Sequence, residues 1–172
     1  MMRLVTVSAL CLTLLSAAPA RAERDWFASL YTNEGIELRA DERIFTLYAL
    51  LNAMGYDDAP VVRQYPVPAR DMHPVRLQVR NELKLDPGQQ AKASSYFDAH
   101  PVPVDQYARY ALTVEPPGTF ARTQGSPNEL KGAEALLADA YGQLKLAEVF
   151  AKVQAEYRAA LKAYLPVVEG PV

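Results

Sequence analysis

Apolar residues recur at intervals of three and four over the last third of the chain, and this spacing is the strongest constraint on its fold. The first series is Leu130, Ala133, Leu137 and Tyr141. After Gly142, a second series comprises Leu146, Val149, Phe150, Val153, Tyr157, Leu161 and Tyr164. Residues spaced in this way lie on one face of an α-helix, so the pattern predicts two amphipathic helices.

The ends of this region carry helix-boundary signals. Ser126-Pro127-Asn128-Glu129 matches a capping box with proline at the first helical position, and Pro166 follows the second series. Because Gly142 leaves only a short joint, we predict that residues 126–165 form an antiparallel helical hairpin. The alternative is one long helix kinked at Gly142.

Residues 41–54 predict a helix buried in the core. Asp41 suits the N-cap, Glu42 suits the first turn, and Gly55 stands where a left-handed glycine ends many helices. Its apolar side chains surround most of the helix circumference: Ile44, Phe45, Leu47, Tyr48, Leu50, Leu51 and Met54. A helix that is apolar nearly all round packs inside a protein.

Prolines divide the middle of the chain into short segments. Pro74 predicts the start of a helix that runs to about residue 83, and Asp86-Pro87-Gly88-Gln89 predicts the start of another, which Pro101 ends. A further helix is expected over residues 104–114. Loops are expected over 56–70 and 115–126, where prolines favour extended backbone.

The first residues after position 22 give weaker signals. Trp26, Phe27, Leu30 and Tyr31 share one face if the segment is helical, whereas residues 36–40 alternate apolar and polar as a short strand does. The predicted fold is therefore all-α or predominantly α, with five to seven helices, the C-terminal antiparallel hairpin and one short strand near 36–40. We expect residues 23–172 to form a single domain.

Residues 1–22 have the three parts of a secretory signal peptide. Arg3 supplies a positive start, residues 4–18 are uncharged and mostly apolar, and Ala20-Arg21-Ala22 is a small-residue cleavage site. The apolar run is shorter than the roughly 20 residues that span a membrane. We therefore expect export to the periplasm or the extracellular space, with no transmembrane span after cleavage.

Composition narrows the classes of function. The only cysteine, Cys11, lies inside the predicted signal peptide, so the exported chain would form no disulfide and no thiolate metal site. The formal net charge is −2, and no cluster of basic residues is present. A nucleic-acid groove or a patch for anionic membranes is therefore not expected.

Metal ligation has few candidate residues. Asp71 with His73 and Asp98 with His100 are the possible pairs, and they would form a site only if the two histidines met in space. Each pair is also explained by a helix boundary, where a histidine near the C-terminus suits the helix dipole. The chain contains no H-E-x-x-H motif, so we predict no metal ligands.

Other catalytic patterns are equally sparse. The serines after position 22 are Ser29, Ser94, Ser95 and Ser126. None of them lies in G-x-S-x-G or S-x-x-K, and no glycine pair forms a phosphate loop. The paired carboxylates Glu37 with Asp41 and Asp57 with Asp58 are more simply helix-start and loop residues. We therefore predict no catalytic residue and no cofactor.

Tyrosines on the C-terminal helices offer a possible recognition surface. Tyr141, Tyr157 and Tyr164 lie on the apolar series and could form an aromatic face for a protein partner. The alternative is that they pack the helices together with their hydroxyls reaching water. The partner, the substrate and the oligomeric state are not encoded in any motif.

Three segments together resemble the N-terminal helical region of exported bacterial proteins that are similar to gluzincin-type zinc metallopeptidases. They are GIELRADERIFTLYALLNAMGYD at 35–57, HPVR at 73–76 and YGQLKLAEVFAKVQAEYRAALKAY at 141–164. In that family the zinc-binding H-E-x-x-H lies further downstream, and no such motif occurs here. The resemblance therefore implies a helical domain and transfers no metal or catalytic residue.

The sequence thus leads to a functional expectation in two forms. The first is an exported, non-catalytic helical domain that acts as a binding or scaffold module, or as the N-terminal part of a metallopeptidase-like protein. The alternative is a self-contained envelope hydrolase whose site has no recognisable motif. A polar cleft where Asp71, His73, Asp98 and His100 converge would favour the second.

Overall fold

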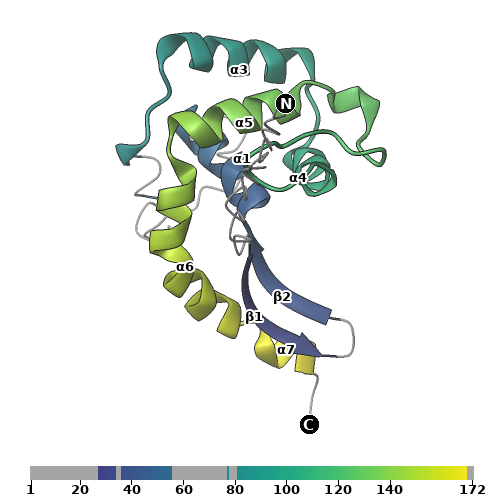
Figure 1. Cartoon of the computed structure of the whole chain (residues 1–172), viewed down its shortest axis with the longest axis vertical. Helices are drawn as coiled ribbons and strands as arrows, with labels where there is room; N and C mark the ends of the chain where they lie inside the picture. The colour runs from purple at the N-terminus through teal and green to yellow at the C-terminus, as the bar shows by residue number, and fades with distance from the viewer. Residues whose placement is uncertain (1–26, 34–35, 56–76, 78–80, 170–172) are drawn as a thin grey trace, which may run out of the picture.

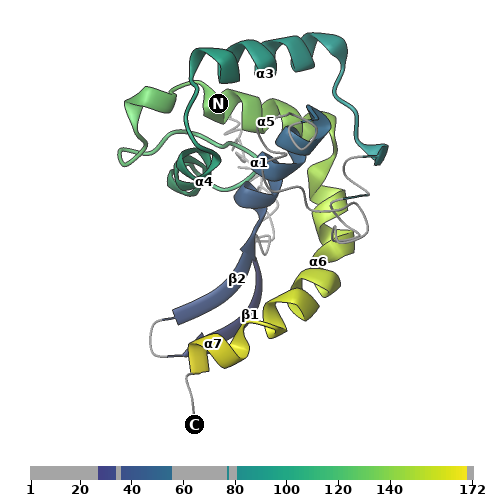
Figure 2. The same cartoon turned by 180° about the vertical axis from the view of Figure 1, so that it is seen from behind.

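The computed structural model of this protein describes residues 27–33, 36–55, 77 and 81–169. The described chain is predominantly helical, as predicted, and the helix number within these ranges agrees with the expected five to seven. The α-helices are α1 (Glu42–Ala53), α3 (Pro87–Ala99), α4 (Val104–Thr113), α5 (Ala133–Gln143), α6 (Leu146–Lys162) and α7 (Leu165–Glu169), with a 3-10 turn η4 (Asn128–Leu130). Helices α1, α3, α4 and α5 gather at one end, and a β-hairpin and α6 extend away from them (Figures 1 and 2).

Strands β1 (Phe27–Asn33) and β2 (Ile36–Asp41) form the antiparallel hairpin. The short strand predicted near 36–40 is confirmed as β2. The helical expectation for Phe27 to Tyr31 is wrong, because these residues belong to β1. A few apolar residues in so short a segment do not separate helix from strand, and pairing with β2 supplies the backbone hydrogen bonds that decide.

Helix α1 has the boundaries that its sequence predicts. Asp41 Oδ1 accepts a hydrogen bond from the Arg43 backbone N–H at 2.9 Å, which caps the first turn. Gly55 has φ of +77°, a left-handed conformation that glycine adopts without strain. Both ends of this core helix are therefore set by local chemistry.

Helix α1 lies between two hydrophobic clusters, which together form the core. Phe45 faces the first cluster, with Phe150 of α6, and the two ring centroids are 5.3 Å apart. Leu51 faces the second cluster, with Tyr107 and Ala111 of α4. The prediction that this helix is buried on most sides is confirmed, although Tyr48 is 44% exposed.

Helices α3 and α4 also follow their sequence signals. Asp86 Oδ1 accepts a hydrogen bond from the Gln89 N–H at 2.9 Å, and Pro87 occupies the first turn of α3. The helix predicted over 104–114 is α4. Of the helix predicted over 74–83, Leu77, Asn81 and Glu82 are described and are helical; positions 74–76 and 78–80 lie outside the described residues.

The predicted capping box at 126–129 is wrong. These residues lead into η4, and α5 begins only at Ala133, after Gly132 has adopted φ of +106°. The Ser126 hydroxyl instead accepts from the Thr123 N–H and donates to the Thr113 carbonyl oxygen, both at 3.0 Å. A serine hydroxyl serves a turn as readily as a helix cap, and here the turn holds it.

The predicted antiparallel hairpin over 126–165 is also wrong. Two separate helices are present, but α6 turns away from α5 and runs beside β1 and β2 (Figure 1). The joint is at Lys145, which has φ of +50°, and Gly142 remains inside α5. A single left-handed residue redirects the helix axis, whereas an antiparallel return requires a loop that reverses the chain. The apolar side of α6 therefore packs on α1 and on the β1–β2 hairpin.

Candidate functional site: an apolar pocket between α1, α3 and α4

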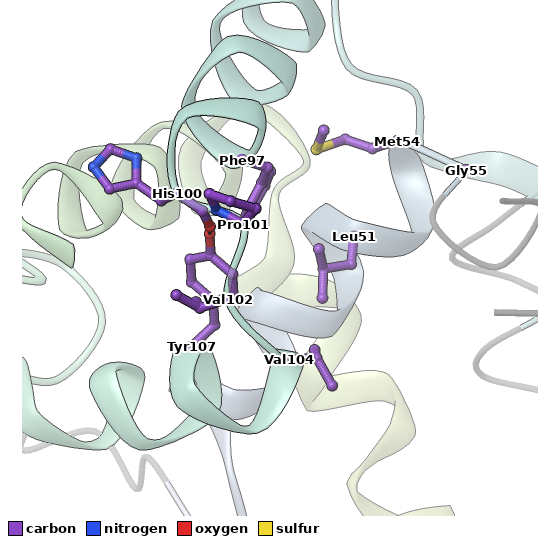
Figure 3. Close-up of a pocket in the computed structure, with 9 residues that line it drawn as sticks. All are labelled: Leu51, Met54, Gly55, Phe97, His100, Pro101, Val102, Val104 and Tyr107. Carbon is purple, nitrogen blue, oxygen red and sulfur yellow. The ribbon is translucent and has the colours of Figure 1, made fainter. Parts of the chain in front are cut away.

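A pocket of about 280 Å³ lies where the C-terminal ends of α1 and α3 meet the start of α4. Figure 3 shows the side chains that surround it. The described residues that line it are Leu51, Met54, Gly55, Phe97, His100, Pro101, Val102, Val104 and Tyr107. Most of these contribute apolar surface, so the pocket suits an apolar group.

Helix ends explain why a hollow forms at this place. Gly55 ends α1, and the segment Pro101-Val102-Pro103 separates α3 from α4. Proline has no N–H and restricts the residue before it to extended backbone, so this connection cannot continue either helix. Helices α3 and α4 are therefore separate, and side chains from their neighbouring ends and from the end of α1 surround the space that remains.

Aromatic rings form one wall of the pocket. The Phe97 and Tyr107 ring centroids are 4.9 Å apart, with an interplanar angle of 80°. Tyr96 contacts Phe97 edge-on from the side of α3, at 5.8 Å. These edge-to-face contacts are favourable beyond the burial of area, and they hold the wall in one arrangement.

The polar atoms at the pocket bond to one another. The Tyr107 hydroxyl donates to the His100 carbonyl oxygen. Desolvation raises the pKa of Tyr107 above its usual value, so the hydroxyl stays protonated at neutral pH. The Tyr107 hydroxyl, which lies at the pocket, therefore has its hydrogen-bond acceptor within the protein.

The imidazole of His100 points away from the pocket (Figure 3). Its Nδ1 lies 2.8 Å from the Tyr96 carbonyl oxygen, and its ring stacks on the Tyr96 ring with centroids 4.1 Å apart. His100 is also the C-cap of α3, as the helix-boundary interpretation predicts. It lines the pocket without presenting its ring nitrogens to it.

A polar cluster holds α4 against α5 beside the pocket. The Tyr110 hydroxyl donates to Glu134 Oε2 at 2.5 Å, and the Gly132 N–H donates to the same oxygen at 2.8 Å. Desolvation alone would raise the pKa of Glu134, but these hydrogen bonds and the positive charge of Arg122 lower it below its usual value. Desolvation raises the pKa of Tyr110. Glu134 is therefore an ionised, structural carboxylate.

The loop that joins α4 to α5 is fixed by Arg122. Its Nη2 donates to the Ser126 carbonyl oxygen at 3.0 Å and to Asn128 Oδ1 at 2.7 Å. Phe120 lies inside the loop, 1% exposed and with φ of +48°, which is strained for a bulky side chain. The Tyr141 ring packs on it at 5.4 Å. Burial of the Phe120 side chain in the core keeps its backbone in this strained conformation.

The candidate metal residues are only partly described. Asp98 is exposed on α3, and His100 is bound as above. Asp71 and His73 lie outside the described residues. Within the described ranges, no group of three or more His, Cys, Asp or Glu side chains could hold a metal ion.

The candidate carboxylates and serines serve structural roles where the structure describes them. Asp41 pairs with Arg43 at the start of α1, at 2.7 Å. Ser94 and Ser95 lie within α3, and Ser126 fixes a turn. Asp57 and Asp58 lie outside the described residues, and the side chains of Ser29 and Glu37 are not described.

The predicted aromatic face is not a single exposed surface. The Tyr141 hydroxyl donates to buried Glu42 at 2.8 Å. Tyr157 packs edge-on against Phe45 at 6.1 Å, and burial raises its pKa to about 12. Tyr164 alone of the three is strongly exposed, at 59%. Of the two possibilities, packing between elements of the core describes Tyr141 and Tyr157, and the three rings do not form one exposed face.

Sequence reasoning missed the pocket itself. Leu51 and Met54 were predicted to lie on the buried helix over 41–54, and nothing in the sequence singled out Val102. The available signal was the proline pair at 101 and 103, which shows that two helices end close together. Whether a hollow remains there depends on side chains from α1, which periodicity along one segment does not reveal.

Comparison of the chain with known protein families, curated proteins and solved structures finds no match. The resemblance to the helical region of metallopeptidase-like proteins therefore stays a prediction. Among the described residues, none of the helices has the length and apolar character needed to cross a membrane.

Proposed function

We propose that this chain is an exported, non-catalytic helical domain that binds a small apolar group in the pocket between α1, α3 and α4. The observation that carries the proposal is the chemistry of the pocket wall. Leu51, Met54, Phe97, Val102 and Val104 offer apolar surface, and the Tyr107 hydroxyl is already bonded to His100. A concave apolar site of this kind is a default candidate for ligand binding.

The same wall argues for binding rather than catalysis. A general acid or base must reach the proton that it transfers, at about 2.6–3.2 Å or through one water. The His100 ring nitrogens are directed away from the pocket, and the Tyr107 hydroxyl already donates its proton to the His100 carbonyl oxygen. The competing hydrolase hypothesis would need reactive groups that the described part of the pocket does not supply.

Export is supported by the N-terminal pattern alone. A positive start, an apolar run and an Ala-x-Ala site agree on cleavage after Ala22. The resemblance would further place such a domain in the N-terminal part of a metallopeptidase-like protein. In that arrangement the domain would contribute binding, while any zinc chemistry would belong to other residues.

Thermal unfolding with a panel of small fragments tests the binding function. The panel includes uncharged, acidic and basic compounds with aliphatic or aromatic groups. A ligand that binds only the folded state raises the free energy of unfolding by RT ln(1 + [L]/Kd), so binders raise Tm. We expect several fragments with an apolar group to raise Tm of the purified protein.

A matched pair of variants locates the effect. Val104 lies at the pocket and is half-buried, whereas Leu112 lies on the same helix and is 46% exposed. Val104→Trp should fill the pocket and abolish the shifts, while Leu112→Trp should keep them. The binding function is contradicted if no fragment raises Tm, or if the shifts survive Val104→Trp in a variant with native circular dichroism.

A further inference from the structure

The volume of the pocket limits the size of its ligand. A dry apolar cavity of about 150 Å³, engineered in another protein, holds one benzene molecule. The pocket here measures about 280 Å³. It therefore has room for about two fused six-membered rings. It is slightly smaller than the pockets that bind drug-sized ligands.

The wall of the pocket favours an aromatic ligand over a saturated one. Phe97 and Tyr107 both line the pocket, and their rings stand nearly perpendicular to one another. Met54 adds a thioether from the end of α1 (Figure 3). Aromatic groups gain from edge-to-face contacts and from sulfur at the ring edge, whereas a saturated ring of the same size gains neither.

The polar atoms at the pocket favour a ligand without charge. The Tyr107 hydroxyl is committed to the His100 carbonyl oxygen, and His100 Nδ1 lies against the Tyr96 carbonyl oxygen. The described side chains that line the pocket therefore provide no ion-pair partner for a charged ligand. Burying a carboxylate or an ammonium group without a partner is far more costly than burying a neutral ring.

The geometry points to an uncharged bicyclic aromatic group, about the size of naphthalene or indole, as the ligand class of this pocket. This inference rests on the proposed binding function and adds size, aromaticity and neutrality to it. Phe97, Tyr107 and Met54 provide the selectivity for aromatic rings. Selectivity against charge arises because the Tyr107 hydroxyl already donates to the His100 carbonyl oxygen.

Three probes with one carbon skeleton test the inference. They are 2-naphthalenemethanol, which is neutral, 2-naphthoate, which is charged, and decahydro-2-naphthalenemethanol, which is saturated. Binding is followed by calorimetry and by methyl NMR shifts of Leu51, Val102 and Val104. We expect the neutral aromatic probe to shift these methyl signals and to bind at least about tenfold more tightly than naphthoate.

Two variants test the role of the aromatic wall. Phe97→Leu should reduce the preference for the aromatic over the saturated alcohol, whereas Tyr164→Leu, which changes an exposed ring elsewhere, should leave it unchanged. If Phe97→Leu fails to fold, Met54→Leu tests the same preference with almost no change in volume.

The outcomes separate this inference from the function on which it rests. If none of the probes and no fragment of the wider panel binds, the proposed function is overturned. If naphthoate shifts the same methyl signals and binds as tightly as the alcohol, the neutral class is overturned and the binding function survives. Equal binding of the saturated and aromatic alcohols likewise overturns the aromatic class.

Discussion

Arg43 and Asp41 form a two-point ion pair at the start of α1, with Nε 3.0 Å from Oδ1 and Nη2 2.7 Å from Oδ2. The third nitrogen of the guanidinium, Nη1, donates to the carbonyl oxygens of Leu112 at 3.0 Å and Val114 at 2.9 Å. One arginine side chain thus joins the end of β2, the first turn of α1 and the last turn of α4. The helix pair that frames the pocket depends on this contact.

Replacing this arginine should destabilise the fold strongly. The two side chains are only 12% and 6% exposed, so Arg43→Ala leaves a largely buried carboxylate with only its longer ion pair to Arg39, at 3.8 Å. We expect a loss of about 3 kcal/mol in the free energy of unfolding, measured by urea denaturation. The control is Arg109→Ala, since Arg109 and its partner Asp105 are 80% and 59% exposed. That change should cost less than about 0.5 kcal/mol, and equal losses in the two variants would contradict the prediction.

Truncating the centre of the α6 stripe should also cost much stability. Phe150 is fully buried against Phe45 and Tyr157, with ring centroids 5.3 and 5.9 Å away. Phe150→Ala removes most of these contacts and leaves a cavity, so we expect a loss of about 3–5 kcal/mol in urea melts. Tyr164→Ala, at an exposed ring, should change stability by less than about 0.5 kcal/mol. A small loss for Phe150→Ala would mean that the stripe does not support the core.

Local signals predicted the parts of the fold that local chemistry decides. The carboxylate of Asp41, the left-handed Gly55 and the first-turn Pro87 each act within one helical turn, so α1 and α3 begin or end where expected. Phe150 was placed on the buried stripe by spacing alone. These features need no knowledge of the rest of the chain.

Longer-range contacts decided the features that sequence reasoning missed. Ser126 matches a helix cap, but Thr113 and Thr123 are better placed to bond its hydroxyl once α4 lies beside the loop. The direction of α6 depends on Lys145, a lysine in a left-handed conformation that composition does not suggest. The pocket likewise arises from three elements that meet only in space.

Acid should weaken the contact between α4 and α5 through Glu134. An unfolded glutamate titrates near 4.5, and the pKa of Glu134 is lowered in the folded protein. The ionised form therefore stabilises the fold at pH above about 4.5, and this contribution is lost as the pH falls through the folded pKa. We expect unfolding free energy to drop less between pH 6 and about pH 3 in Glu134→Gln than in the unaltered protein. Identical pH profiles would contradict the role assigned to the Tyr110–Glu134 hydrogen bond.

Export should leave a defined N-terminus. If residues 1–22 are a signal peptide, the Ala20-Arg21-Ala22 site directs cleavage so that the product begins at Glu23. Mass spectrometry of the periplasmic or secreted fraction measures this directly. Ala22→Tyr should block cleavage, because signal peptidase requires a small residue there, whereas Arg21→Lys should not. A soluble cytoplasmic product that retains Met1 would contradict export.

The purified chain should neither retain stoichiometric zinc nor cleave peptides. A catalytic zinc site takes about three protein ligands and keeps one position open for water. The chain has two histidines, and its one cysteine lies in the predicted signal peptide. His100 has its Nδ1 against the Tyr96 carbonyl oxygen and its ring stacked on Tyr96, so binding a metal through that nitrogen would break this contact. Dialysis against zinc, metal quantification and a peptide-cleavage assay with and without chelator test the prediction. Stoichiometric zinc with chelator-sensitive cleavage, both lost in His73→Ala, would overturn the non-catalytic proposal in favour of the hydrolase.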